Sequence, residues 1–322
     1  MNEKKQICKQ LRREFGVNGW FLLLYFALMN GMVLLVTVAD SVIFTAQMLS
    51  QGMEQGQIEE LLPQRLMSNG WGYLLATAIG ALILLAWKKK EFCFQTIWQA
   101  KKPMTVGTFL VLVCATLSGQ AFFQLTVPLL QFLFGLMGFS LTDFLQSASV
   151  GTDTVSMFLY VCLAAPIFEE VLFRGVVLRH LEPYGKKFAI LGSAFLFGIF
   201  HGNVVQSPYA FVVGLVFGYV AVEYSMVWAM VLHMINNLLL SDTLGRLLQF
   251  LPDITQSLIL MGIIWGATLI FGIVMLVNRK KVAAWLGTGK MHPWCVGSFF
   301  TTAGIVVLTL VLLGNVILAL FL

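Results

Sequence analysis

Long apolar stretches separated by short polar segments run through the whole chain. About 20 apolar residues suffice to cross the hydrocarbon core of a bilayer as a helix, and a helix satisfies its backbone hydrogen bonds internally, as lipid demands. The pattern therefore predicts an all-α, polytopic membrane helical bundle with about nine transmembrane helices. They are expected at residues 19–45, 71–87, 105–139, 155–179, 188–205, 208–224, 226–241, 256–277 and 296–322.

Composition agrees with this pattern and excludes several classes of protein. The chain has 322 residues, of which 59% are hydrophobic and 11% are charged, whereas soluble domains have about 25% charged residues. A soluble globular protein, a disordered chain and a disulfide-rich secreted scaffold are excluded. The five cysteines form no CxxC pair and are expected to be reduced thiols. No nucleic-acid partner is expected, because the net charge of +5 is read as a topology signal.

Lysine and arginine are concentrated in four polar segments, at residues 4–13, 88–102, 174–187 and 279–290, which hold 18 of the 20 basic residues. Basic residues accumulate on the cytoplasmic side of membrane proteins. We therefore expect a multi-pass protein of the cell membrane with a cytoplasmic N-terminus and an external C-terminus. Four regions follow: a basic cytoplasmic tail (1–18), three N-terminal spans (19–149), a core of four spans (150–245) and two C-terminal spans (246–322).

Two stretches need separate interpretation. The apolar stretch 105–139 is long and contains Pro128. Splitting it into two spans would move Lys186 and Lys187 to the external side, so we predict one span that is tilted or kinked at Pro128, or one with a re-entrant end. The segment 46–70 is rich in acids and glutamines and is predicted to be a solvated short helix.

Ionisable side chains are costly at membrane depth and are therefore candidates for function. In this chain they gather within the core of four spans, as Glu169, Glu170 and Arg174 in one span, His201 in the next, and His233 with Asn237 in the last. At about 1.5 Å per helical residue, Glu169, His201 and His233 lie roughly 10–20 Å from the cytoplasmic ends of their spans. That depth permits one shared cavity.

Helical spacing gives each cluster a geometry. Glu170 and Arg174 are four residues apart, so they share a face and can form an ion pair. Glu169 points about 100° away and is not obviously neutralised by that arginine. Phe197 and His201, and likewise His233 and Asn237, are also four residues apart. Each of these pairs is expected on one helix face.

A purely structural reading exists for each cluster. Glu169 and Glu170 would then be solvated at an emerging helix end, and His201 would be a packing histidine that donates to a backbone carbonyl. His233 and Asn237 would be interhelical hydrogen-bonding residues. The Gly214-xxx-Gly218 and Gly262-xxx-Gly266 patterns are read as sites of close helix packing.

The three clusters together resemble the motifs of a known family. Glu-Glu-xxx-Arg (169–174), Phe-xxx-His (197–201) and His-xxx-Asn (233–237) are similar in order, spacing and helical placement to the motifs of the CPBP family. This family comprises the CAAX proteases and bacteriocin-processing enzymes and is also called the Abi family. The resemblance covers roughly residues 150–245. It implies an intramembrane endopeptidase that cleaves a membrane-embedded or lipidated peptide, CAAX-like or leader-like, within the lipid bilayer.

The resemblance also implies a role for each residue. Glu169 would be the general base, His201 would orient and activate the water, and His233 and Asn237 would bind the developing oxyanion. Glu170, Arg174 and Phe197 would support them. The sequence shows no evident Ser–His pair and no reactive cysteine near a histidine, so it does not indicate a covalent route.

Several alternatives stay open at this point. No cofactor is expected, although two His, two Glu and an Asn could supply three ligands to Zn²⁺ with an open water position. A non-catalytic membrane scaffold or bacteriocin self-immunity protein could use the same fold. A transporter would require polar lines through several spans and broken, repeated helices, which the outer spans lack.

Overall fold

The computed structural model describes residues 2–87, 95, 98–148, 151–240, 247–289 and 291–321. Within these residues the regular elements are helices and there are no strands, so the predicted all-α class is confirmed. The basic residues Lys88, Lys89, Lys90, Arg246 and Lys290, which entered the charge argument, lie outside the described residues, as does Cys93.

Eighteen helical elements follow one another along the described chain. They are α1 (Asn2–Ser50), α2 (Gln55–Met67), α3 (Trp71–Trp87), α5 (Val106–Leu136), α6 (Thr142–Ala148), α7 (Val155–Leu159), η2 (Tyr160–Ala164), α8 (Ala165–Glu170), η3 (Val171–Leu178), α9 (Arg179–Leu181), η4 (Glu182–Tyr184), α10 (Lys186–Phe200), α11 (Gln206–Glu223), α12 (Met226–Leu240), α14 (Asp253–Val277), α15 (Arg279–Gly287), α16 (Cys295–Phe300) and α17 (Ala303–Phe321).

The number of membrane-crossing helices differs from the expected nine. Six helices in the described residues are long and apolar enough to cross a membrane, so the molecule is a multi-pass membrane protein but the count of nine is not confirmed. The remaining predicted stretches fold as α10, α11 and α12, with 15, 18 and 15 residues. A helix of 15 residues is about 22 Å long, shorter than a hydrocarbon core of about 30 Å.

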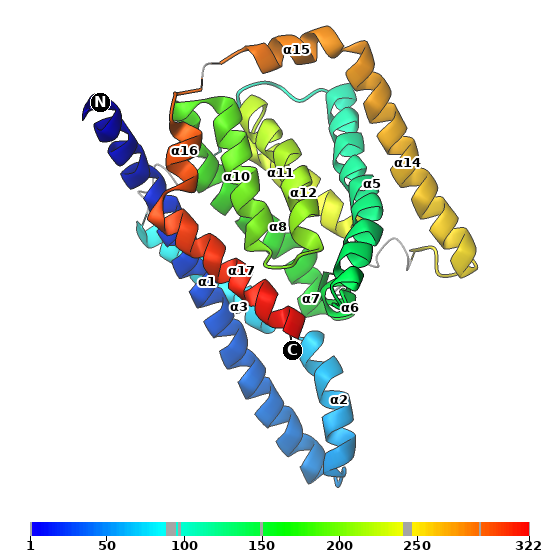
Figure 1. The fold of residues 1–322 in the computed structure, drawn as a ribbon. Coiled ribbons are helices and arrows are strands. Elements are labelled where there is room, and N and C mark those ends of the chain that lie inside the picture. The colour runs from blue at the N-terminus through cyan, green and yellow to red at the C-terminus, as the bar shows by residue number, and fades with distance from the viewer. Residues whose placement is uncertain are drawn as a thin grey trace.

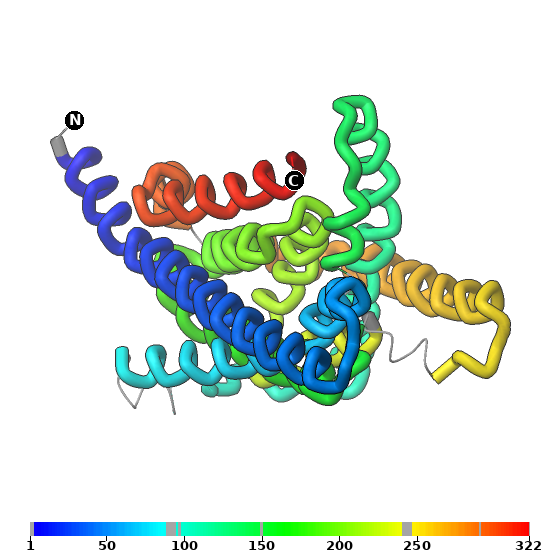
Figure 2. Tube along the Cα trace, turned by 90° about the horizontal axis from the view of Figure 1, so that it is seen from below, coloured from blue at the N-terminus to red at the C-terminus, as the bar shows by residue number. Residues whose placement is uncertain are grey.

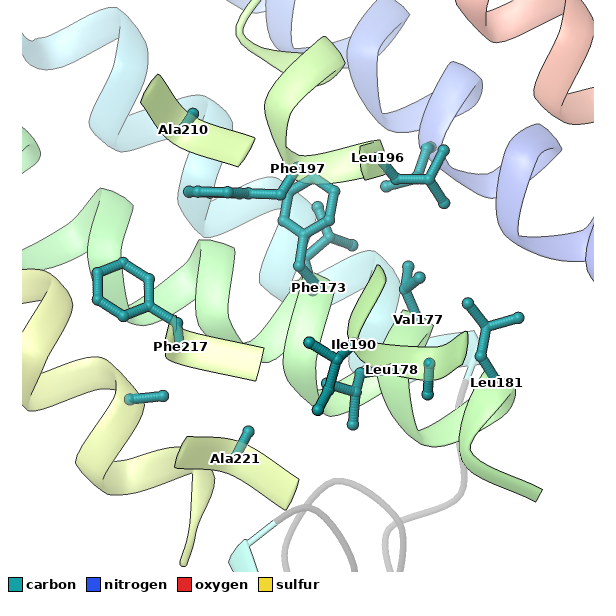
Figure 3. Close-up of a cluster of buried hydrophobic side chains, with 14 of the residues drawn as sticks. Phe173, Val177, Leu178, Leu181, Ile190, Leu196, Phe197, Ala210, Phe217 and Ala221 are labelled. Carbon is teal, nitrogen blue, oxygen red and sulfur yellow. The ribbon is translucent and has the colours of Figure 1, made fainter. Parts of the chain in front are cut away.

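The short helices α10, α11 and α12 lie at the centre of the bundle, where Figure 1 shows them between α1 and α17 on one side and α5 and α14 on the other. Figure 2 shows α1 and α14 again at opposite sides of the molecule. The central core is apolar and aromatic, and Figure 3 shows Phe173, Phe197 and Phe217 within it. Burying these large side chains holds the helices that carry the ionisable residues in fixed positions.

The basic segments meet at one end of the bundle. The backbone N–H of Lys101 donates to the carbonyl of Tyr224 at 2.7 Å, and Lys186 pairs with Glu223 at 3.2 Å. At the same end Lys4 lies 3.7 Å from the ring centroid of Trp294. Figure 1 shows the N-terminus at the upper left and α15 at the top. The described residues of these segments therefore lie at one end of the fold.

Local structure departs from the expected tail. Residues 2–18 are not a separate tail but the first turns of α1, a continuous helix of 49 residues. Phe15 is fully buried and packs edge-on against Tyr184 and Phe299, with ring centroids 5.1 and 5.9 Å away. Apolar residues among the basic ones therefore anchor this segment to the core.

The other two doubtful stretches are resolved as helices. Residues 106–136 form one helix, α5, which continues through Pro128, so the interpretation of a single long element is confirmed. The segment expected to be a solvated short helix contains α2, which has one buried residue, Ile58.

The two glycine patterns have different outcomes. A Cβ on Gly214 would lie 3.1 Å from Phe197, and one on Gly218 would lie 3.2 Å from Ile190, so α10 and α11 do pack closely there. A Cβ on Gly262 or Gly266 would meet no atom within 4 Å among the described residues. The prediction of close packing at Gly262-xxx-Gly266 is wrong within this chain, because α14 turns that face outward.

Candidate active site

Glu169 and Glu170 stand on a short α-helical segment between two π-helical ones. The π-helices η2 (Tyr160–Ala164) and η3 (Val171–Leu178) flank α8 on both sides. A π turn accommodates an extra residue and shifts the direction in which the following side chains point, and such turns are frequent at functional sites. The directions of the side chains around Glu169 and Glu170 therefore differ from those in a regular α-helix.

Glu170 and Arg174 form the predicted ion pair. Nη1 of Arg174 donates to Oε1 of Glu170 at 3.0 Å, and both side chains are fully buried. Nη2 of Arg174 donates to the carbonyl of Gly214 at 3.1 Å. The guanidinium carbon also lies 4.3 Å from the ring centroid of Phe197. Arg174 thus neutralises Glu170 and ties its helix to α10 and α11.

His233 lies between the two carboxylates. Its Nδ1 is 2.9 Å from Oε1 of Glu170, and its Nε2 is 3.9 Å from Oε2 of Glu169. An ionised carboxylate only accepts hydrogen bonds, so Nδ1 carries a proton. The imidazole stacks on Phe217 with centroids 4.9 Å apart. The sequence showed no partner for Glu170 other than Arg174, since this contact joins residues of different helices.

The two acids differ in exposure. The Glu169 side chain is 26% exposed, whereas that of Glu170 is 0% exposed. Glu170 accepts hydrogen bonds from Arg174 and from His233. Glu169 is therefore the acid that can reach a water molecule or a substrate.

His201 caps the C-terminal end of α10. Its Nδ1 donates to the carbonyl of Phe197 at 2.8 Å; a carbonyl only accepts, so Nε2 keeps a free lone pair in the neutral ring. The rings of Phe197 and His201 are perpendicular with centroids 4.8 Å apart. Phe197 also lies edge-on to His233 at 5.7 Å. One phenyl ring thus separates the two histidines.

Asn237 lies one turn beyond His233 on α12 and contacts a different segment. Its Nδ2 donates to the carbonyl of Val161 in η2 at 2.9 Å, while its Oδ1 accepts from Asn236 at 3.2 Å. The structure therefore brings Glu169, Glu170, Arg174, Phe197 and His233 into one cluster with His201 beside it. Asn237 connects α12 to η2, which directly precedes the α8 segment that carries Glu169 and Glu170.

Three further polar residues lead to Asn237. Gln120, Tyr209 and Asn236 are buried and hydrogen-bonded in a row. Gln120 is visible in the sequence as a polar residue within an apolar stretch, and Asn236 stands next to Asn237. Tyr209 carries no sequence signal, because tyrosine is common in membrane helices. Asn203, which lies close to His201 in sequence, instead accepts from the backbone N–H groups of Val205 and Gln206 at the start of α11.

Comparison with known proteins identifies the central segment. Residues 151–239 match the family model described as "Type II CAAX prenyl endopeptidase Rce1-like". Searches of curated proteins and of solved structures gave no match. The matched segment begins before α7, ends within α12 and contains Glu169, Glu170, Arg174, Phe197, His201, His233 and Asn237. The resemblance to the CPBP and CAAX protease family is confirmed for this segment.

Proposed function

We propose that this chain, which carries an Rce1-like CAAX protease domain at residues 151–239, is an intramembrane endopeptidase of the glutamate type. The observation that carries the proposal is His233, held between the carboxylates of Glu169 and Glu170 inside an apolar core. Hydrolysis by an activated water needs a general base and a donor to the developing oxyanion, and the partly exposed Glu169 and the imidazole of His233 can supply these two functions.

Each group has a defined part in the reaction. Glu169 takes a proton from a water that His201 orients through Nε2, and the water oxygen bonds to the peptide carbonyl carbon. The carbonyl oxygen becomes an oxyanion, which His233 and Asn237 stabilise. For Nε2 of His233 to donate, the ring must carry both protons, and its charge then balances Glu169 as Arg174 balances Glu170. Glu169 finally returns the proton to the amine as the C–N bond breaks.

The proposed substrate is a membrane-associated peptide, either CAAX-like or a bacteriocin or leader peptide, and the proposed location is the cell membrane. The test is proteomics of membrane peptides from cells that carry the wild type or Glu169→Ala. We expect uncleaved precursors to accumulate with Glu169→Ala while the protein folds normally. Glu59→Ala, which changes an exposed acid on α2, is the matched control. A fully active, folded Glu169→Ala protein would overturn the assignment.

We propose that the hydrolysis does not use a metal. In support, Nδ1 of His233 is bound to Oε1 of Glu170, and Arg174 binds the same oxygen, so these two groups are engaged with one another. A zinc-dependent version is tested by phenanthroline inhibition together with metal analysis of the purified protein. Tightly bound zinc in stoichiometric amount would replace the metal-free mechanism.

One observation favours a second candidate function. The amide of Asn237 is already engaged, by Asn236 within α12 and by the carbonyl of Val161 in η2, as it would be in a scaffold or self-immunity protein that binds a peptide without cleaving it. Identical peptide profiles from wild-type and Glu169→Ala cells would support this second candidate.

A further inference from the structure

A row of hydrogen bonds connects α5 to the helix that carries Glu169. The amide of Gln120 on α5 donates to the hydroxyl of Tyr209 on α11. The Tyr209 hydroxyl donates to Oδ1 of Asn236 at 2.6 Å, and Nδ2 of Asn236 donates to Oδ1 of Asn237 at 3.2 Å. Nδ2 of Asn237 donates to the carbonyl of Val161 at 2.9 Å. The row thus crosses four elements.

The last bond sets the direction of every other bond in the row. The carbonyl of Val161 only accepts, so Asn237 must present its NH₂ group there and its oxygen to Asn236. Asn236 must then present its NH₂ group to Asn237 and its oxygen to Tyr209. The Tyr209 hydroxyl must donate to that oxygen and accept from Gln120. Reversing one amide would place two donors or two acceptors face to face.

The surroundings of Tyr209 show a closely fitted site. Gln120, Tyr209 and Asn236 are 6%, 7% and 3% exposed. Gly119 lets α5 approach the ring, since a Cβ there would lie 3.3 Å from Tyr209 Cε2 and 2.5 Å from Val213. Phe123, one turn further on α5, packs edge-on against Tyr209 with centroids 5.7 Å apart. A buried row in which each hydrogen bond determines the direction of the next holds a single arrangement.

We propose that Gln120, Tyr209 and Asn236 are positioning residues that, together with the carbonyl of Val161, hold the Asn237 amide in one orientation. This inference rests on the proposed function, in which Asn237 binds the oxyanion. One N–H of Asn237 is bound to Val161, and the row points the other N–H in one direction. A donor held in place before the reaction stabilises an oxyanion without reorganisation. Gln120 lies outside the matched segment 151–239, so α5 is part of the enzyme's machinery.

The first test is turnover of a quenched fluorescent peptide that ends in a farnesylated CAAX sequence, with purified full-length protein. Tyr209→Phe removes the hydroxyl and keeps the ring. We expect kcat to fall about five- to tenfold, the value of one hydrogen bond in the transition state, with KM unchanged. Tyr219→Phe, on the same helix but outside the row, is the control and should leave both constants unchanged. An unchanged kcat for Tyr209→Phe overturns the proposal.

A double-mutant cycle separates positioning from a general structural effect. In the Asn237→Ala background, Tyr209→Phe should cause no further loss of kcat, because Tyr209 acts through Asn237. Independent losses that multiply would show that Tyr209 does not act through Asn237 and would overturn the proposal. Asn236→Asp, which keeps an acceptor for Tyr209 but has no N–H for Asn237, should reproduce the effect of Tyr209→Phe.

The same proteins keep the inference testable if the proposed function fails. A wild type that cleaves no peptide and behaves like Glu169→Ala would refute the endopeptidase proposal. The row is then judged by thermal unfolding of the wild type, Tyr209→Phe, Asn237→Ala and the double variant. A combined shift in Tm smaller than the sum of the single shifts supports the row, and an additive shift refutes it. If Asn237→Ala has no measurable turnover, this thermal-unfolding cycle tests the proposal in place of the kinetic cycle.

Discussion

His233 and Glu170 are joined by a hydrogen bond of 2.9 Å between Nδ1 and Oε1, although 63 residues separate them in sequence. The same carboxylate oxygen accepts from Nη1 of Arg174 at 3.0 Å. Glu170 therefore belongs to a buried charge cluster, while the adjacent Glu169 keeps an exposed face. Of these two neighbouring glutamates, Glu170 therefore has a structural role and Glu169 can contact a substrate or water.

This division predicts that two neighbouring substitutions differ strongly in their effect on stability. Glu170→Ala leaves Arg174 buried without its ion-pair partner, and breaking a buried pair typically costs about 3–5 kcal/mol. We expect a large fall in the free energy of unfolding, measured by denaturant titration in detergent micelles. Glu169→Ala should change it little.

Asp40→Ala provides the control for loss of an ion pair as such. Asp40 pairs with Arg65, whose side chain is 51% exposed, and exposed pairs contribute about 0–1 kcal/mol. A similar loss of stability for Glu170→Ala and Asp40→Ala would contradict the structural role assigned to Glu170.

The sequence predicts those parts of the site that depend on one helix. The Glu170–Arg174 pair and the contact of Phe197 with His201 both follow from a spacing of four residues, and both are present. The His233–Glu170 bond and the Asn237–Val161 bond join different helices. Their registers depend on how whole helices pack and on the π segments η2 and η3, which no local pattern indicates.

The fold was predictable for a similar reason and to a similar extent. Apolar length located the helices, and charge placement grouped the basic segments at one end. Apolar length could not show that α10 has only 15 residues, because His201 and Gly202, which follow it, lie within a continuous apolar stretch. Nor could it show that Phe15, surrounded by basic residues, is buried.

Tyr25 of α1 is predicted to be needed for turnover. Its ring lies 5.2 Å from Phe168 and 5.9 Å from Phe200, the residues immediately before Glu169 and His201. Tyr25→Ala removes this support, and displacement of catalytic groups by about 1 Å can cost about 100-fold in rate. We expect kcat of the folded protein to fall by about 10–100-fold, while Tyr25→Phe retains most activity.

Phe15→Ala is the matched control for that experiment. Phe15 is fully buried but lies at the basic end, against Tyr184 and Phe299. It should destabilise the protein by about 3–5 kcal/mol, as large aromatic deletions do, and leave kcat of the folded fraction unchanged. Equal losses of kcat in Tyr25→Ala and Phe15→Ala would show that the effect of Tyr25 is general destabilisation.

Two glycines of α1 are predicted to respond oppositely to alanine. A Cβ on Gly19 would lie 2.3 Å from the backbone of Gly304, so α17 must move away, and such overpacking typically costs about 1–3 kcal/mol. A Cβ on Gly31 would meet no atom within 4 Å among the described residues. Gly31→Ala should therefore be neutral or stabilise the helix by up to about 1 kcal/mol. Thermal unfolding of both variants checks this, and a stable Gly19→Ala protein would refute the close crossing of α1 and α17.

The side of the membrane that the basic end faces can be determined by labelling. Lys281 is exposed on α15 at the basic end, and Glu60 is exposed on α2, which Figure 1 shows at the opposite end of the molecule. Because basic segments stay in the cytoplasm, a membrane-impermeant maleimide applied to intact cells should label Glu60→Cys and spare Lys281→Cys. Permeabilised cells should show labelling of both, and the wild type gives the background from native cysteines. Labelling of Lys281→Cys but not Glu60→Cys in intact cells would invert the orientation and place the N-terminus outside.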